Sequence, residues 1–434
     1  MKYLCSRWLG IALLALAPSA YSYDLLDAWH AARDYNADFA AARANLSAGR
    51  EQAIQGRAQL LPQVGASANY SYTHLTLPAN LPGYDSTSYG VSLKQPLFDI
   101  SKYTGYQKGQ IGTRQAEISF QASEQQLMLT IAQAYFKVLL AQDTLAATQA
   151  SKKAYQTQLA QARAAFDVGT ATITDTHEAQ AGYDAASARE ISALNDLEVS
   201  QYTLRQLTGL EVQGVQPLQA NLPLTRPLPD SLQAWSDNAL RNSLTIQAAE
   251  QALEYARQTV TEKRGNHLPV VSLEAGYTDS RSHLSINQMP QNRGSSIGVG
   301  VTLPLFAGGG INSQVREALA KEEAARDQLE ASKRQVRENV RQAFLGITNG
   351  AALVRAQQQL LVSAKSKLDS TRLGKEVGIR TNLDVLQAEQ SYYDALTSLA
   401  TAKYNYLLAR LALAQSAGQL DEALLADVNR VIRH

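Results

Sequence analysis

Four short segments of the chain alternate between apolar and polar residues. In the first, Ala66, Ala68, Tyr70 and Tyr72 fall on one face, while serine, asparagine and threonine fall on the other. Alternation with a period of two is typical of a half-buried β-strand. The pattern predicts strands at about residues 62–74, 87–97, 269–279 and 296–305.

Each pair of strands is followed by a long segment with a helical pattern. Residues 97–216 and 305–434 contain no proline and are rich in Ala, Gln, Glu, Arg and Leu. In the last part, Leu396, Leu407 and Leu411 belong to a narrow apolar seam that is typical of helices packed side by side. A helix of about 65 residues reaches roughly 100 Å. The composition therefore predicts two very long helical hairpins, at about residues 101–208 and 311–418.

The two halves of the chain repeat one another. Trp29, Pro62 and Gly169 each have a counterpart about 206–209 residues later. Each repeat is predicted to contain an opening helix, two strands and a hairpin, and a proline- and leucine-rich linker joins the repeats. The predicted units are repeat 1 (23–208, opening helix 24–59), the linker (209–229), repeat 2 (230–418, opening helix 230–264) and a C-terminal equatorial segment (419–434).

The first 22 residues are typical of an export signal. Lys2 and Arg7 precede an apolar stretch that ends at Pro18, and small residues follow near Ser22. We therefore expect a signal peptide at residues 1–22 that is cleaved near Ser22. The single cysteine, Cys5, is then removed, so we expect no disulfide and no cysteine metal site in the exported protein.

Composition narrows the possible functions. The chain has 40 Lys and Arg against 39 Asp and Glu, a balance that argues against nucleic-acid binding. No catalytic, phosphate-binding or metal-binding motif is recognisable, so we expect no enzyme activity, no cofactor and no metal. No later run approaches 18 consecutive apolar residues, so we expect any membrane span to consist of β-strands.

The alternating strands fit either a soluble sandwich or a transmembrane barrel. Segments of about ten residues match a tilted span, and 20 Tyr against 7 Phe suits rings that lie at a membrane interface. Four strands are too few to close a barrel, for which about eight are needed. If the chain spans a membrane, it must oligomerise: a dimer provides about eight strands with a filled interior, and a trimer about twelve with a lumen.

The ends of the two hairpins carry matching turn signals. Val168-Gly169 and Val377-Gly378 place glycine where a helix ends in a left-handed residue. A T-x-x-D sequence then restarts each helix, with Asp175 in the first hairpin and Asp384 in the second. The sequence therefore predicts two similar tips.

These residues resemble the TolC family of outer-membrane efflux and secretion ducts. The similar stretches include residues 166–175, 377–386 and 402–408, with the Leu-Pro pairs before two strands and the Pro-Leu-Phe runs after two others. The resemblance implies a mostly α fold with a transmembrane β-barrel contribution: a homotrimer whose twelve strands lie in outer-membrane lipid and whose helices form a periplasmic tunnel. It also implies, as partners, a periplasmic membrane-fusion adaptor and an ABC- or RND-type inner-membrane transporter. The implied function is passive exit of drugs or, in type I secretion, of proteins.

The resemblance also implies roles for residues at the tips. By position, Thr174, Asp175 and Arg380 are expected to form a latch that closes the tunnel, and Asp384 to supply an acidic constriction ring. Two positions depart from the family pattern. Lys375 stands where an aromatic latch residue is common, and Gln387 stands where a second acidic ring can occur. We therefore expect one acidic ring, with Lys375 as a changed latch position.

Two alternatives remain at this point. Asp175 and Asp384 lie in first helical turns, where capping alone explains a carboxylate, and Arg380 can be a solvated surface charge. For the whole chain, the alternative is a soluble periplasmic coiled-coil adaptor or scaffold. Such adaptors have one hairpin flanked by several small β-domains, whereas this chain repeats two hairpins.

Overall fold

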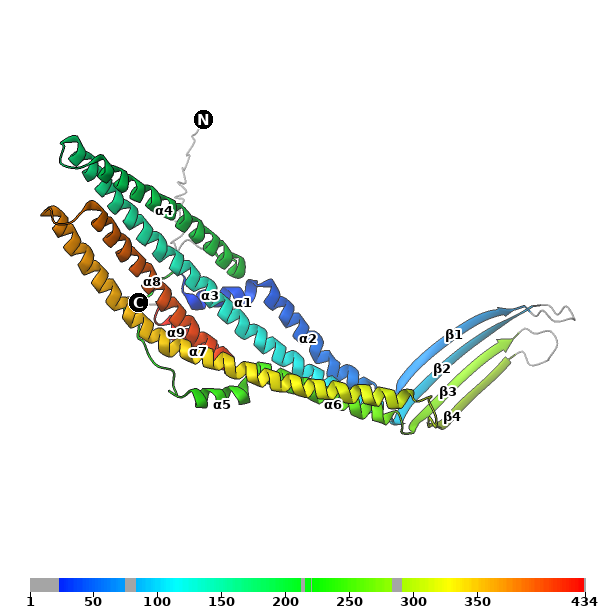
Figure 1. Ribbon diagram of the computed structural model, residues 1–434. Helices are drawn as coiled ribbons and strands as arrows, with labels where there is room; N and C mark the ends of the chain where they lie inside the picture. Colours follow the sequence, from blue (N-terminus) through cyan, green and yellow to red (C-terminus); the bar gives the residue numbers. More distant parts are fainter. Residues whose placement is uncertain (1–22, 75–82, 212–214, 220, 283–290, 433–434) are drawn as a thin grey trace, which may run out of the picture.

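The computed structural model describes residues 23–74, 83–211, 215–219, 221–282 and 291–432. Long helices form an extended arm, and a sheet continues from one end of that arm (Figure 1). The hairpin turns lie at the opposite end. The predicted signal peptide, residues 1–22, lies outside the described residues.

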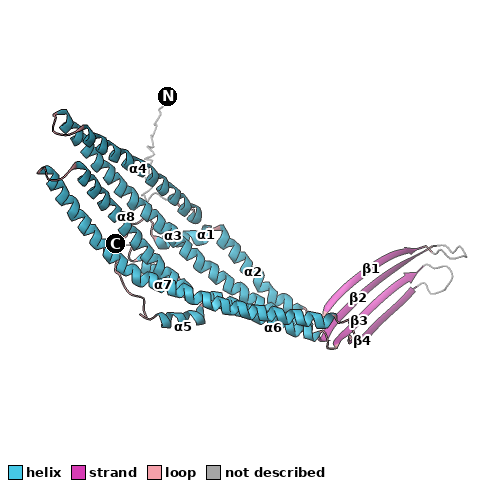
Figure 2. Ribbon diagram, in the orientation of Figure 1, coloured by secondary structure: helices cyan, strands magenta, loops and turns pink. Residues whose placement is uncertain are grey.

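The described chain is mostly helical, with one sheet (Figure 2). No helix among the described residues is both long enough and apolar enough to cross a membrane. The order of elements is α1 (Leu25–Tyr35), α2 (Ala37–Ala58), β1 (Gln63–Thr73), β2 (Tyr84–Phe98), α3 (Ile100–Asp167), α4 (Ile173–Thr208), α5 (Leu232–Asn242), α6 (Leu244–Gly265), β3 (Val270–Ser282), β4 (Gln291–Thr302), α7 (Gly310–Glu376), α8 (Asn382–Ser416) and α9 (Glu422–Asn429).

The structure divides each predicted opening helix into two helices. Asn36 has an extended backbone (ψ 121°); its N–H donates to the Ala32 carbonyl at 2.8 Å, and its side chain accepts the Phe39 N–H at 3.0 Å. One residue therefore ends α1 and caps α2. Ser243 interrupts the second opening helix at ψ 125°, where its N–H donates to the Ala239 carbonyl at 2.9 Å, but its side chain does not cap α6. The sequence prediction missed both breaks because neither position carries proline or glycine.

The sheet is antiparallel throughout, in the order β1-β2-β3-β4. Val91 lies opposite Ala66 on one side and Tyr277 on the other, so the apolar residues of the strands share one face. β4 ends at Thr302 rather than near residue 305, since Pro304 has no N–H for the ladder. Within the described chain β1 and β4 each pair on one side only, which leaves both lateral edges of the sheet open.

The two long helices α3 and α7 contain 68 and 67 residues, roughly 100 Å each. α3 packs along α4 and α7 along α8, forming the two hairpins, and α3 also contacts α8 between the hairpins. Small residues allow the close approach: Ala179, Ala186 and Ala193 are buried on α4. This order of elements places two similar tips beside each other.

The main core lies midway along the arm, a region that we call the equator. The C-terminal segment contains α9, a helix that the sequence analysis did not predict. Asn429 of α9 connects this segment to the start of α1. Its side chain accepts the Leu25 N–H at 3.0 Å and donates to Asp24 at 2.8 Å. Core side chains from all nine described helices meet here, among them Trp29, Phe39, Tyr135, Leu204, Ala239, Ile246, Val340, Leu407 and Leu425.

Candidate functional site

The two tips have the same turn geometry. Gly169 and Gly378 have φ of 76° and 80°, a left-handed conformation that costs glycine little. The backbone closes each helix end: Thr170 N–H donates to Ala165 at 2.8 Å, and Ile379 N–H donates to Gly374 at 2.9 Å. The neighbouring Val168 and Val377 are exposed.

Asp175 and Asp384 complete matching capping boxes. In the first hairpin, Thr172 N–H and its hydroxyl donate to the Asp175 carboxylate at 2.9 and 2.7 Å, and Asp175 N–H donates to the Thr172 hydroxyl at 3.2 Å. Thr381 and Asp384 repeat this arrangement at 2.9, 2.9 and 3.1 Å. The side chain and backbone of each threonine hold the pKa of the aspartate below its ordinary value. Both caps therefore persist as pH falls, until it passes through these lowered pKa values.

Thr174 and Arg380 do not join the other predicted latch residues through hydrogen bonds within the described protomer. Both side chains are exposed. The Arg380 stem lies over Gly374, where an added Cβ would sit 2.7 Å from the Arg380 Cγ. Its guanidinium makes no hydrogen bond or ion pair with a described residue, although its charge acts on Asp384.

Lys375 connects to the other hairpin through Asn382. The Lys375 ammonium donates to the Asn382 side-chain oxygen at 2.8 Å, and the Asn382 amide in turn donates to the Asp175 carbonyl at 3.5 Å, the long limit of such a contact. Burial lowers the pKa of Lys375, while Glu389 and Asp175 oppose that change. Lys375, which the resemblance led us to expect as a changed latch position, thus contacts a buried asparagine.

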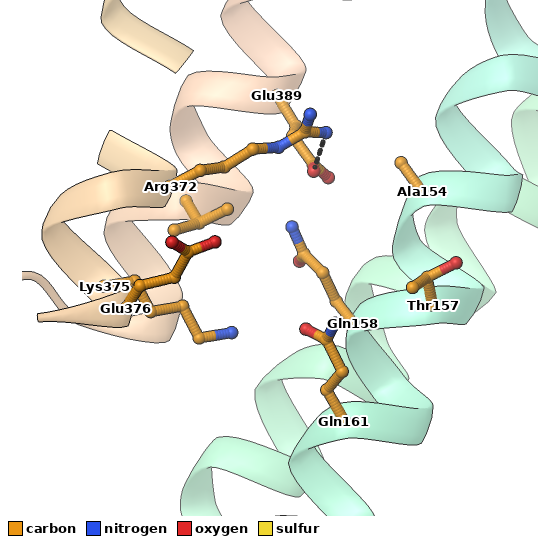
Figure 3. Close-up of a pocket in the computed structure, with 9 residues that line it drawn as sticks. Ala154, Thr157, Gln158, Gln161, Arg372, Lys375, Glu376 and Glu389 are labelled. Carbon is orange, nitrogen blue, oxygen red and sulfur yellow. Dashed lines mark hydrogen bonds and ion pairs between the residues drawn. The ribbon is translucent and has the colours of Figure 1, made fainter. Parts of the chain in front are cut away.

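A polar cavity of about 410 Å³ lies between the two hairpins, close to the tips. Glu389 of α8 is 1% exposed and accepts from Arg372 of α7 at 2.8 Å. Figure 3 shows the amide of Gln158, on α3, pointing toward this pair. Lys375 and Glu376 also line the cavity.

The sequence analysis missed this cluster, although a signal was present. Glu389 lies four residues after Val385 and seven before Leu396, so it shares the apolar stripe of its helix. A charged residue on a buried stripe needs a partner. That partner, Arg372, lies on another helix, where no spacing rule could identify it.

Comparison with known proteins places the whole chain in one family. The profile of the family described as outer membrane efflux protein matches residues 28–210 and 235–419. Outer membrane protein TolC of Salmonella enteritidis is 33% identical over 445 residues, which cover 100% of this chain and 89% of the relative. Alkaline protease secretion protein AprF of Pseudomonas aeruginosa is 34% identical over 436 residues, covering 98% and 90%.

Solved structures show the same fold. The outer membrane protein VceC of Vibrio cholerae superposes with a TM-score of 0.79 at 19% identity, covering 91% of this chain and 96% of its own. The CmeC outer membrane channel of Campylobacter jejuni gives 0.78 at 16% identity, covering 100% and 97%. The resemblance found in the turn and strand motifs is thus confirmed, and the relatives argue against an enzyme. The chain belongs to the outer membrane efflux protein family and is a protein of the outer membrane.

Proposed function

We propose that three copies of this chain form an exit duct through the outer membrane, with the helices as a periplasmic tunnel. The observation that carries the proposal is the four-stranded sheet, whose two edges, β1 and β4, are unpaired in the described protomer. In lipid, unpaired backbone groups cost several kcal/mol each, so edges must meet other edges. Three sheets of four strands close a barrel wide enough for a lumen.

The helical arm supports the same assembly. α4 and α7 lie on opposite lateral borders of the arm, on the same sides as β1 and β4 respectively (Figure 1). Both helices expose large apolar side chains. On α4 these include Ile191, Leu194, Val199 and Tyr202, and on α7 Leu345, Leu353, Leu360 and Val362. Two different apolar borders on one chain suit a head-to-tail contact that closes into a ring.

The two faces of the sheet suit lipid and water. One face exposes Val64, Tyr70, Ile297 and Val299, which fits hydrocarbon and its interface. The strand positions between them are mainly serine, glycine and threonine, with a Lys94–Glu274 ion pair at 2.9 Å. A polar face of small side chains leaves room for a water-filled lumen and passive passage.

The relatives indicate classes of cargo and partner. AprF and PrtF are named for protease secretion, while TtgC and ArpC are named as outer membrane proteins of efflux pumps. We infer that this duct carries secreted proteins, drugs or both. It receives them from an ABC- or RND-type inner-membrane transporter through a periplasmic membrane-fusion adaptor.

The duct is gated at the tips. In this proposal Thr174, Asp175, Lys375 and Arg380 belong to the latch, and the turns at Val168-Gly169 and Val377-Gly378 fix the hairpin ends. Three copies of Asp384 form the acidic constriction ring. The low energy of exposed polar contacts, about 0–1 kcal/mol each, suits a closure that partner proteins must open.

Purified protein in detergent tests the proposal by mass and by conductance. We expect a mass of three protomers by light scattering and discrete conductance steps in planar bilayers. Release of the chain from washed membranes without detergent would favour the soluble scaffold instead. A monomer without conductance would overturn the duct.

A further inference from the structure

The polar face of the sheet carries one pair of opposite charges. Lys94 of β2 and Glu274 of β3 lie directly opposite each other in the strand register, and Lys94 Nζ lies 2.9 Å from Glu274 Oε1. The other described strand residues on this face are uncharged, mainly serine, glycine, threonine and asparagine. The remaining charged residues of the described strands lie on the opposite face, near the loop ends of the strands: Asp85, Asp279, Arg281 and Arg293.

This ion pair is open to solvent near the helical end of the sheet. Its lysine and glutamate side chains are 62% and 56% exposed, and Ser272 donates to Glu274 Oε1 at 3.3 Å. On the other side Glu274 faces Gly298, where an added Cβ would meet nothing within 4 Å. Glu274 lies four residues after Val270, where β3 begins, or roughly 13 Å along the strand. An exposed pair contributes little to stability, so its main effect is on the charge of this face.

We propose that Lys94 and Glu274 determine the charge selectivity of the barrel, because each cancels the charge of the other in the lumen. The inference rests on the proposed function, since only a closed barrel turns the polar face of the sheet into a lumen. Three copies of the chain place three ammonium and three carboxylate groups in one ring, with a formal sum of zero. A lumen without net charge passes cargo of either sign, so selection by charge is left to the tips.

The field of this ring depends on the balance between its two kinds of charge. The field of an exposed charge decays over about 10 Å in 0.1 M salt and over about 3 Å in 1 M salt. Opposite charges 2.9 Å apart therefore cancel over most of a lumen. Three charges without partners would instead attract ions of the opposite sign into it. Loss of one partner should thus change selectivity far more than loss of both.

Reversal potentials of purified trimers in a KCl gradient test this balance. Lys94→Gln leaves three carboxylates, so we expect the permeability ratio of K⁺ to Cl⁻ to rise about threefold near 0.1 M salt. Glu274→Gln leaves three ammonium groups, so we expect the same ratio to fall by about the same factor. The two substitutions together restore the balance, and the ratio should return to that of the unaltered chain. In about 1 M salt both single-variant shifts should shrink, which a change of structure alone does not explain.

Two controls test whether the sum and the position of the charges decide the result. Lys94→Glu combined with Glu274→Lys exchanges the partners but keeps the sum at zero, so the permeability ratio should not change. Asp279→Asn removes one negative charge from the same strand as Glu274→Gln, but from the opposite face, where Asp279 pairs with Arg293 at 2.9 Å. It should leave the ratio unchanged. If one single variant of the pair fails to assemble, the other still tests the balance from its own side.

The outcomes separate this inference from the proposed function. If the unaltered chain conducts and either Lys94→Gln or Glu274→Gln keeps its permeability ratio, the pair does not determine selectivity and the duct stands. Equal shifts in Glu274→Gln and Asp279→Asn would overturn the inference as well, because the charge would then act from either face of the sheet. If the unaltered chain forms no conducting trimer, the proposed function itself fails.

Discussion

At the equator one apolar cluster gathers side chains from both halves of the chain, whereas near the tips two clusters of only three buried residues each join the helices. The polar groups differ as well. At the equator, Tyr135 donates to the Tyr23 and Gln216 carbonyls, and Tyr406 donates to the Thr225 carbonyl. At the tips, the polar contacts are instead the two capping boxes and the Arg372–Glu389 ion pair.

This difference separates a fixed region from one that can open. Apolar burial gives the equator most of its stabilisation, and burial of this kind is lost only on unfolding. The tips depend on helix caps and a few polar contacts, which can exchange for water. The fold thus has its lowest local stability at the tips, the region that opens in the proposed function.

The largest expected effect comes from breaking the equator. Trp29 is fully buried beside Phe39, with ring centroids 6.4 Å apart. Trp29→Ala should lower the free energy of unfolding by about 3–5 kcal/mol, because it leaves a large cavity. Urea unfolding of the detergent-solubilised protein measures this effect.

The matched change at the tip is Val168→Ala, at a residue that is 73% exposed. It should alter the free energy of unfolding by no more than about 0.5 kcal/mol. Equal losses for Trp29→Ala and Val168→Ala would show that the equator is not the fixed region.

Those features of the fold and of the tips that depend on local sequence pattern could be predicted from the sequence. Alternation located the four strands and their faces, and the Val-Gly turns with T-x-x-D located both tips. The prediction failed where residues far apart in the sequence determine the local structure or the burial of a side chain. The break at Asn36 follows from packing of α1 into the equator, and the burial of Glu389 depends on Arg372 and Gln158 from two other helices.

A smaller effect should follow from changing Asp384, the proposed ring residue at the second tip. Asp384→Ala removes both a cap and a negative charge, and with three copies at the aperture it should reduce the preference for cations roughly twofold or more. It should also weaken block by multivalent cations. Reversal potentials in a salt gradient measure the preference.

Thr381→Ala provides the control for the ring. It removes the hydroxyl that pairs with Asp384 but keeps the carboxylate, so the helix cap weakens by about 1 kcal/mol while the charge remains. Cation preference should therefore survive in Thr381→Ala. If Asp384→Ala also leaves it unaltered, Asp384 is a cap and not a ring residue.

The smallest change in free energy is expected at Arg380, whose exposed guanidinium has no hydrogen-bond partner within the described protomer. As a latch residue, Arg380 must find its partner on another copy, where an exposed contact is worth about 0–1 kcal/mol. Arg380→Ser should thus leave unfolding almost unchanged yet raise the time-averaged conductance up to about fivefold, the factor that ~1 kcal/mol gives. Arg355→Ser makes the same substitution at an exposed position of α7 away from the tip, and it should change neither quantity. Equal conductance in both variants would remove Arg380 from the latch and leave Lys375, Asn382 and Asp175 as the contact that holds the tips.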